Sequence, residues 1–433
     1  MPEKILVLKS GVCGWARCRF CGYGRMPGNE PTYPNLRKEF DSFFREVQAG
    51  DTVKVFGSGS FLDVKQVPKD ARRYFIDKCN EKGVMKLTIE SRPEYIKKEA
   101  LDEFSGLDLT VAIGLEVADD KILDRISKGF HLKDYEEATS IIHSCNAKVR
   151  TYLLVNPPYV KDTGKSLDES VEYALKHSDS LVLINMLPHG NTPLYRMWLR
   201  GEWTYLSRDE FYKITEKWKN NPGIDLDVET FRFVPKFPRE CRDPLKGVGE
   251  EYLTHPHFEV WQDYLQRWYR PPEEKDILLF LPCTYTKPYS QSQTHRGIVE
   301  TLKKTETYPR IHQVLLSNTG IVPREFEDMY PFNAYDWDES LETEEIKERY
   351  IEVTKSRIKK YLSAHKDNYK KICCFLKYSS ESYQALADAC RELGMECKNL
   401  LKKETYEKIK GQGKALQTEA ALMDLYDNLI KEQ

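Results

Sequence analysis

Short apolar segments alternate with longer amphipathic segments through the first half of this 433-residue chain. Six of them have the length and the β-branched or aromatic content of strands, at residues 5–9, 53–56, 86–90, 109–116, 149–155 and 180–186. Helical periodicity lies between them, around residues 65–82, 94–104, 119–127, 132–145 and 166–177. Repeated strand–helix units favour a parallel sheet, so we predict an α/β fold, either a partial (β/α)6 TIM-like barrel or a doubly wound sheet.

The alternation stops at a stretch rich in proline and histidine and then restarts. We predict a barrel domain at residues 1–234, a connector at residues 235–274 and a smaller α/β domain at residues 275–433. In the last domain, strands are expected at residues 277–281, 312–316 and 371–376, and helices at residues 342–364, 380–393 and 414–431. In a partial barrel the chemistry belongs at the carboxyl ends of the strands.

Composition excludes few functions. Lys plus Arg (66) nearly equals Asp plus Glu (68), so the net charge neither requires nor rules out a nucleic-acid partner. The sequence has no apolar run of about 18 residues and no secretory signal pattern, so we expect a cytoplasmic protein without membrane spans. Eleven cysteines, sparse and odd in number, indicate free thiols and metal ligands and not a disulfide framework.

Three of these cysteines, Cys13, Cys18 and Cys21, lie within nine residues on a glycine-rich loop after the first strand. Such a density of thiols is typical of a soft-metal site. Zinc would require a fourth ligand nearby, but the next cysteine is Cys79 and the next histidine is His131. A plant-type ferredoxin has the same spacing but a fourth cysteine as well. Three thiolates on a [4Fe–4S] cluster would leave one iron without a protein ligand.

The loop resembles that of the radical S-adenosylmethionine (SAM) superfamily, although the usual spacing C-x3-C-x2-C is one residue shorter. The resemblance implies a [4Fe–4S] cluster held by Cys13, Cys18 and Cys21, with S-adenosyl-L-methionine on the open iron. It also implies three kinds of cofactor contact. They come from an aromatic residue on the loop, Phe20, from the small-residue turn after the second strand, which is Gly57, Ser58, Gly59 and Ser60, and from the polar residues Glu90, Arg92 and Glu116 at strand ends. Alternatively, the turn is only a strand-to-helix connection and the charged residues are caps or ion pairs.

A second cluster of reactive side chains follows the strand expected at residues 277–281. A thiol near lysine and histidine can be held partly as thiolate and attack an electrophilic carbon such as a nitrile. We therefore assign Cys283, Lys287 and His295 as catalytic residues. The intervening hydroxyl residues are assigned to substrate binding, and they are Tyr289, Ser290 and Ser292. A polar loop around a buried structural cysteine is the alternative.

The pattern P-C-x3-K-P-Y-S-x-S-x2-H is similar to the lysine-transfer core of archaeosine synthases, and residues 317–336 resemble its next block. The first half, at residues 58–63, 90–93 and 126–129, is similar to the radical-SAM archaeosine lyases that partner those synthases. The transglycosylase-like and PUA domains of full-length synthases are missing from the sequence. The resemblance therefore implies a separate synthase subunit as a partner that supplies tRNA binding.

The function implied by the resemblance has two steps. The side-chain amine of lysine adds to the nitrile carbon of 7-cyano-7-deazaguanine in tRNA, and a radical step then cuts the bond between the ε-carbon of lysine and that nitrogen, leaving archaeosine. The partners would be tRNA and lysine or the lysine-modified deazaguanine. Two alternatives stay open: a radical-SAM enzyme of another nucleic-acid modification, and a C-terminal domain that only docks tRNA or a partner protein.

Overall fold

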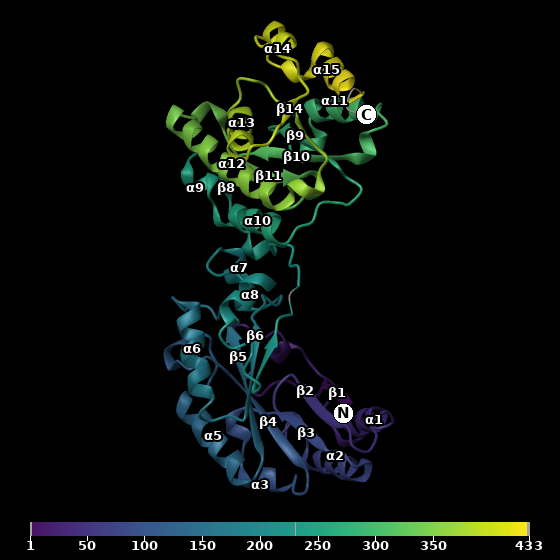
Figure 1. Cartoon of the computed structure of the whole chain (residues 1–433), viewed down its shortest axis with the longest axis vertical. Coiled ribbons are helices and arrows are strands. Elements are labelled where there is room, and N and C mark those ends of the chain that lie inside the picture. The colour runs from purple at the N-terminus through teal and green to yellow at the C-terminus, as the bar shows by residue number, and fades with distance from the viewer. Residues whose placement is uncertain (1, 230, 431–433) are drawn as a thin grey trace. The chain divides into compact units, whose positions relative to one another are not determined.

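The computed structural model describes residues 2–229 and 231–430, which form two compact units (Figure 1). The first unit contains the chain up to Trp198 together with Trp203–Phe231. The second contains Leu199–Glu202 and the chain from Arg232 onward. Residues 235–274, expected to form a connector, belong to the second unit, where helix α10 (Pro256–Arg267) packs against its neighbours.

The described part of the first unit contains one seven-stranded sheet in which every neighbouring pair is parallel. Its strands are β1 (Glu3–Leu8), β2 (Thr52–Gly57), β3 (Lys86–Glu90), β4 (Asp108–Glu116), β5 (Lys148–Val155), β6 (Ser180–Asn185) and β7 (Ile224–Asp227). Their order in the sheet is their order in the chain, whereas a doubly wound sheet reverses direction. The partial barrel is thus confirmed, with β7 as an added strand and β1 and β7 as unpaired edges of this described sheet.

Helices cover the outer face of this curved sheet (Figure 1). They are α1 (Tyr33–Phe43), α2 (Lys69–Lys82), α3 (Lys98–Asp102), α4 (Asp120–Arg125), α5 (Leu132–Ser144) and α6 (Thr163–Ala174), and β6 is followed by α7 (Pro193–Leu199) and α8 (Arg208–Thr215). Side chains alternate between the two faces of a strand, so Val53 and Val55 of β2 are buried toward Phe75 and the helices. Lys54 and Phe56 point to the inner face.

The second unit contains a sheet with the strand order β11 (Gly320–Pro323), β10 (Ile311–Ser317), β9 (Ile277–Pro282), β13 (Lys371–Cys374) and β14 (Lys398–Asn399). Within it β11 is antiparallel to β10 and the other pairs are parallel. Besides α10, the helices are α9 (Glu250–Leu253), α11 (Gln293–Leu302), α12 (Glu344–His365), α13 (Glu381–Leu393), α14 (Lys403–Ile409) and α15 (Glu419–Ile430). A short ladder joins β8 (Leu245–Lys246) to β12 (Tyr335–Asp336).

Strand β9 lies between β10 and β13. The chain leaves β9 toward β10 on one side and later returns to β13 on the other, so the winding direction changes at β9. Ligands of open α/β sheets bind outside the carboxyl ends of the strands at such a switch point, and Cys283 is the first residue after β9. In the described residues, no helix has both the length and the hydropathy needed to cross a membrane.

Candidate functional site

The curved sheet of the first unit encloses a cavity of about 640 Å³. Its walls are inward-facing residues from both edges and the middle of the sheet, among them Lys54, Thr88, Glu90, Arg150, Tyr152 and Asp227. Arg150 and Tyr152 alternate with the buried Val149, Thr151 and Leu153 along β5. This alternation is visible in the sequence, and the sequence analysis did not use it. The cavity wall combines charged side chains of both signs with apolar ones such as Phe56 and Ile184, so it suits a substrate that has both polar and apolar parts.

The three-cysteine loop lies between β1 and α1 and is attached to the end of α4. The backbone N–H of Arg19 donates to the carbonyl of Ile126 at 2.9 Å, and the Trp15 indole N–H donates to Ser127 at 2.7 Å. The backbone N–H of Gly24 donates to Cys21 Sγ at 3.3 Å. Cys13, Cys18 and Cys21 are free and partly exposed. The loop thus presents three partly exposed thiols, with Cys18 and Cys21 near Glu116 at a strand end of the barrel.

A buried ion pair lies beside these thiols. Lys128 Nζ contacts Glu116 Oε1 at 2.6 Å, and the same ammonium lies 6.0 Å from the centre of the Phe20 ring. Burial raises the pKa of Cys18 and of Cys21, and the charge of Lys128 opposes both shifts. Lys128 therefore favours the thiolate forms that a metal requires, whereas the charge of its partner Glu116 raises both pKa values. The sequence analysis quoted the segment that contains Lys128 but gave this lysine no role.

Two acidic residues at strand ends point toward the same edge. Glu116 has a left-handed backbone with φ 75°, next to a register shift between Gly114 and Glu116. Such a bulge redirects a side chain and is typical of functional sites. Glu90 accepts a hydrogen bond from the Gly57 N–H at 3.0 Å and another from Tyr152. Burial raises the pKa of Glu90 to about 7.

Arg92 connects the strand end to the turn after β2. Its backbone N–H donates to Ser60 Oγ at 3.0 Å, and its guanidinium donates to the Lys128 carbonyl at 3.0 Å and to Glu94 at 2.5 Å. The remaining nitrogen, Nη2, is buried without a hydrogen-bond partner within the described structure. A buried guanidinium nitrogen without a partner is suited to receive a ligand carboxylate.

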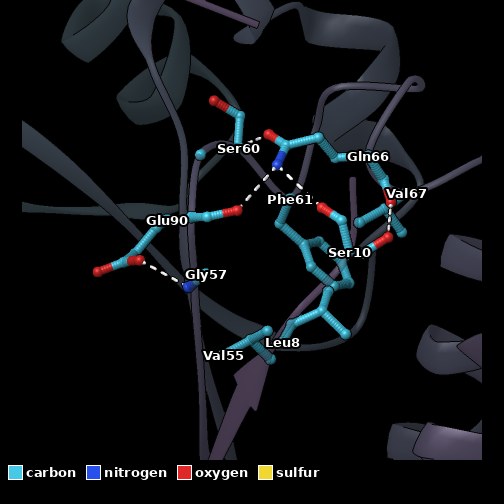
Figure 2. A pocket seen from close by; sticks show the side chains of 11 residues that line it. Leu8, Ser10, Val55, Gly57, Ser60, Phe61, Gln66, Val67 and Glu90 are labelled. Atoms are coloured by element: carbon cyan, nitrogen blue, oxygen red, sulfur yellow. Dashed lines mark hydrogen bonds between the residues drawn. The ribbon is translucent and has the colours of Figure 1, made fainter. Parts of the chain in front are cut away.

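Figure 2 shows what holds the Gly57–Ser60 turn in place. The carboxamide of Gln66 accepts from the Ser60 N–H at 2.8 Å and donates to the Ser10 carbonyl at 3.1 Å and to Ser58 Oγ at 3.5 Å. Ser10 Oγ in turn donates to the Gln66 carbonyl at 2.5 Å. Gln66 was missed in the sequence, where nothing distinguishes it from an exposed glutamine. Its role becomes visible only when β1 and the turn are brought together.

In the second unit, Cys283 is partly exposed at the carboxyl end of β9 and lines two pockets of about 540 and 390 Å³. Burial raises the pKa of Cys283 to about 11, Glu339 adds to the rise, and Lys287 opposes it. Burial lowers the pKa of Lys287, whose ammonium lies 3.8 Å from the centre of the Tyr335 ring. The structure therefore brings Cys283 and Lys287 together in one pocket.

The other residues predicted for this site are engaged in the fold. His295 is fully buried in the first turn of α11, with Nε2 2.9 Å from the Pro282 carbonyl and Nδ1 2.9 Å from Arg324. Since a guanidinium can only donate, Nδ1 accepts and Nε2–H donates, so the imidazole is neutral with both nitrogens occupied. This geometry gives His295 the role of positioning Pro282, next to Cys283, and leaves it no free nitrogen for proton transfer.

The three hydroxyl residues predicted to bind substrate occupy different environments. Tyr289 is fully buried and its hydroxyl lies 3.0 Å from those of Ser317 and Tyr335. Ser292 Oγ accepts from the backbone N–H of His295 at 3.2 Å and so caps α11. Ser290 is exposed, and its backbone N–H donates to Glu327 at 3.1 Å. Tyr289 supports the pocket wall through Tyr335, and Ser292 has a capping role.

Comparison with known protein families agrees with this division. Residues 8–174 match the radical SAM superfamily, and residues 258–411 match a domain of unknown function, DUF5591. The chain thus contains a radical SAM domain followed by a DUF5591 domain, which confirms the class predicted from the cysteine loop.

The chain is homologous to archaeosine synthase subunit beta. It is 28% identical over 218 residues to that subunit of Methanosarcina acetivorans, covering 46% of this chain and 61% of the subunit. With the subunit of Thermococcus kodakarensis it shares 31% identity over 199 residues, covering 43% of this chain and 61% of the subunit. It is also 35% identical over 120 residues to the alpha subunit of M. acetivorans, covering 26% of this chain and 19% of that subunit. The chain therefore spans about three fifths of the beta subunits that it matches.

The cofactors of a radical SAM domain are a [4Fe–4S] cluster and SAM, and the residues of this loop fit them. Ligands of a single zinc ion at 2.3 Å stand about 3.8 Å apart. Among the described residues, Asp243, His255 and His257 have ligand atoms that all lie within 4.8 Å of one another, and the three loop cysteines do not. The loop sulfurs are therefore spaced more widely than the ligands of one ion. Three free thiols on one loop are the soft ligands that an iron–sulfur cluster takes. The glycine-rich turn and the unpartnered Nη2 of Arg92 suit the amino acid end of SAM.

Proposed function

We propose that this chain is a radical SAM enzyme of archaeosine biosynthesis that cleaves the lysine C–N bond of the lysine adduct of 7-cyano-7-deazaguanine in tRNA. The observation that carries the proposal is homology to both the beta and the alpha subunit of archaeosine synthase within one chain. A DUF5591 domain with a reactive cysteine pocket is further support. We assign lysine transfer to this second domain, so that one chain performs both steps.

In the first unit, a bound cluster and SAM would supply the radical chemistry, and the residues of this unit would hold the lysyl carbon next to nitrogen within its reach. The turn at residues 57–60, held by Gln66, and the Arg92 Nη2 group bind the amino acid end of SAM. The buried pair Lys128 and Glu116 lies beside the thiolates. The lysyl arm carries a carboxylate and an amine. The cavity wall holds Lys54 and Arg150, which pair with Glu3 and Asp225, and Asp227, so charges of both signs face the arm.

In the second unit, Cys283 Sγ attacks the nitrile carbon, and a proton passes to the nitrile nitrogen to give a thioimidate. The amine of lysine then forms the new C–N bond, the C–S bond breaks, and the thiol recovers its proton. Lys287 moves these protons, because burial brings its pKa closer to neutrality. The smaller pocket beside Cys283 has Lys377 and Glu381 in its wall, a pair of charges that complements a free amino acid.

The C–N cleavage is tested with anaerobically reconstituted protein, lysine-adduct tRNA, SAM and a strong reductant. We expect archaeosine and 5′-deoxyadenosine in equal amounts from the wild-type protein, and neither from Cys18→Ala. Cys145→Ala is the matched control, because Cys145 is also a partly exposed free thiol of the first unit but lies outside the loop. Formation of 5′-deoxyadenosine without archaeosine would leave the radical chemistry intact and reject the substrate.

Lysine transfer is tested with lysine and cyano-deazaguanine tRNA in the absence of SAM. An adduct formed by the wild-type protein and by Cys145→Ala, but not by Cys283→Ala, supports covalent catalysis at Cys283. Adduct formation by Cys283→Ala at the wild-type rate would remove the covalent step. If the wild-type protein forms no adduct but binds tRNA through its second unit, the domain is a docking module.

A further inference from the structure

Three potential metal ligands meet in the second unit, outside the cavity and the pockets described above. They are Asp243, His255 and His257, and their ligand atoms all lie within 4.8 Å of one another. His255 Nε2 and His257 Nε2 lie 3.6 and 3.5 Å from the same oxygen, Asp243 Oδ2. A hydrogen bond between these groups would measure about 2.7–3.2 Å. Two nitrogen or oxygen ligands 2.0–2.1 Å from one tetrahedral ion stand about 3.4 Å apart, which is close to the observed separations.

The hydrogen bonds behind His257 allow the ring orientation and tautomer that metal binding needs. Its Nδ1 lies 2.7 Å from the hydroxyl of Tyr330, and this hydroxyl donates to the Asp243 carbonyl at 3.3 Å. When the Nδ1–H of His257 donates to Tyr330, whose hydroxyl also accepts from the backbone N–H of Asp243 at 3.0 Å, Nε2 presents a lone pair to the carboxylate of Asp243. In this tautomer His257 Nε2 and Asp243 Oδ2 are two acceptors 3.5 Å apart, and a cation between them satisfies both. A ligand histidine whose other nitrogen donates to an outer partner is the usual arrangement at metal sites.

His255 has a second role as the N-cap of α10. Its Nδ1 accepts from the backbone N–H of His257 at 3.2 Å, which places the ring proton on Nε2 in the metal-free chain. Coordination through Nε2 exchanges this hydrogen bond for the bond to the ion, because the ring proton then resides on Nδ1. The loss of one capping bond, about 1 kcal/mol, is small beside the binding free energy of structural zinc sites.

We propose that Asp243, His255 and His257 form a binding site for a divalent transition-metal ion, Zn²⁺ in the first place, with the fourth position open to water. Two imidazoles and one carboxylate are ligands that zinc accepts readily. The site has a structural use. Asp243 shortly precedes β8, which pairs with β12, and β12 carries Tyr335 and Asp336 of the Cys283 pocket. The ion ties this pocket wall to the start of α10.

The experiment must separate this site from the cysteine loop. In a Cys13→Ser, Cys18→Ser, Cys21→Ser variant, dialysis against Zn²⁺ should leave about one zinc per chain, and Co²⁺ should give the absorption of a four-coordinate site. Adding Asp243→Asn should weaken metal binding by more than about tenfold. Asp243 is largely exposed, so this change should leave the fold intact. The control is His143→Gln, which removes an exposed histidine hydrogen-bonded to Asp179 at 3.0 Å.

A second measurement uses the protein with its iron–sulfur cluster reconstituted, where zinc is quantified beside iron by mass spectrometry. We expect one zinc in the wild-type protein and in His143→Gln, and loss of that zinc in Asp243→Asn. Absence of zinc and cobalt binding in the variant without the three loop cysteines would overturn the proposal. So would zinc that is retained equally by Asp243→Asn and by the control, since it would then belong to other ligands. Neither outcome bears on the archaeosine reaction.

Discussion

The turn after β2 depends on the absence of a side chain at Gly59. A Cβ atom at this position would lie 2.1 Å from Gln66 Oε1 and 2.9 Å from Gln66 Cδ, well inside van der Waals contact. Gln66 is 4% exposed and is hydrogen-bonded to Ser10 and Ser60, so it cannot move aside without breaking those bonds. We therefore predict that Gly59→Ala displaces the Gln66 carboxamide and releases the turn.

The magnitude follows from the groups left behind. Displacement of Gln66 removes the hydrogen-bond partners of the Ser60 N–H and of the Ser10 carbonyl, both in a buried environment. Each buried group without a partner costs about 1–3 kcal/mol, so the first unit should lose about 2–6 kcal/mol. At about 2–4 °C per kcal/mol for a unit of this size, Tm falls by at least about 4 °C. SAM affinity should fall at least about tenfold, which corresponds to about 1.4 kcal/mol.

The assay combines thermal unfolding followed by circular dichroism with equilibrium binding of SAM to reconstituted protein. Gly57→Ala is the matched control for stability, because a Cβ at Gly57 would meet its nearest neighbour, the Leu8 carbonyl oxygen, at 3.5 Å. In a double-mutant cycle, Gln66→Ala should cost much less in the Gly59→Ala background than alone. A Gly59→Ala protein with wild-type Tm and SAM affinity would refute the role of Gln66.

Three further predictions concern ionisable groups. Cys283 has its pKa raised to about 11, so at pH 8 it has roughly 200-fold less thiolate than an ordinary thiol, and its higher nucleophilicity offsets about tenfold of this. Iodoacetamide should therefore label Cys283 about 20-fold more slowly in the folded than in the urea-unfolded chain, at a rate that still rises above pH 9. A labelling rate that reaches a plateau below pH 9 would contradict the raised pKa. Burial lowers the pKa of His295 to about 3, so the stability that this residue contributes is complete above pH 6.5 and is lost as the pH falls toward 3. The unfolding free energies of the wild-type protein and of His295→Gln, measured in urea, should therefore approach each other by about 2 kcal/mol between pH 7 and pH 5. A constant difference between them would show that the histidine is not held neutral. Glu116→Gln leaves Lys128 buried without its counter-ion and should lower the free energy of unfolding by about 3–5 kcal/mol. Asp108→Asn, which breaks an exposed ion pair, should lower it by less than about 1 kcal/mol in the same urea titrations. Equal effects of the two variants would mean that water reaches the pair of Lys128 and Glu116.

The strands of the barrel were predictable because they are apolar and helices separate them. The last strand was not, since Ile224–Asp227 is short and half of its residues are aspartates. The stretch around Pro256 was interpreted as a connector because proline usually breaks helices. Here Pro256 is the first residue of α10 and His255 is its cap, a position where the missing N–H of proline has no cost. The same residue thus indicates a break or a beginning, and tertiary packing decides which.

The candidate sites show a similar division. The cysteine loop and the Gly57–Ser60 turn are linear motifs, so the sequence alone located them. Gln66 and Lys128 act through contacts with residues distant in the chain, which no local pattern records. His295 was assigned to catalysis because reactive side chains are dense around Cys283. Part of that density belongs to the start of α11, where Ser292 caps the helix and His295 is hydrogen-bonded on both sides.

In the described structure the barrel has a seam, because β1 and β7 are the two ends of the sheet and do not pair with each other. A cavity that is open to solvent can take one nucleotide of a long polymer while the rest stays outside. The volume of the cavity, about 640 Å³, therefore limits the size of the reacting group and not the size of the molecule that carries it.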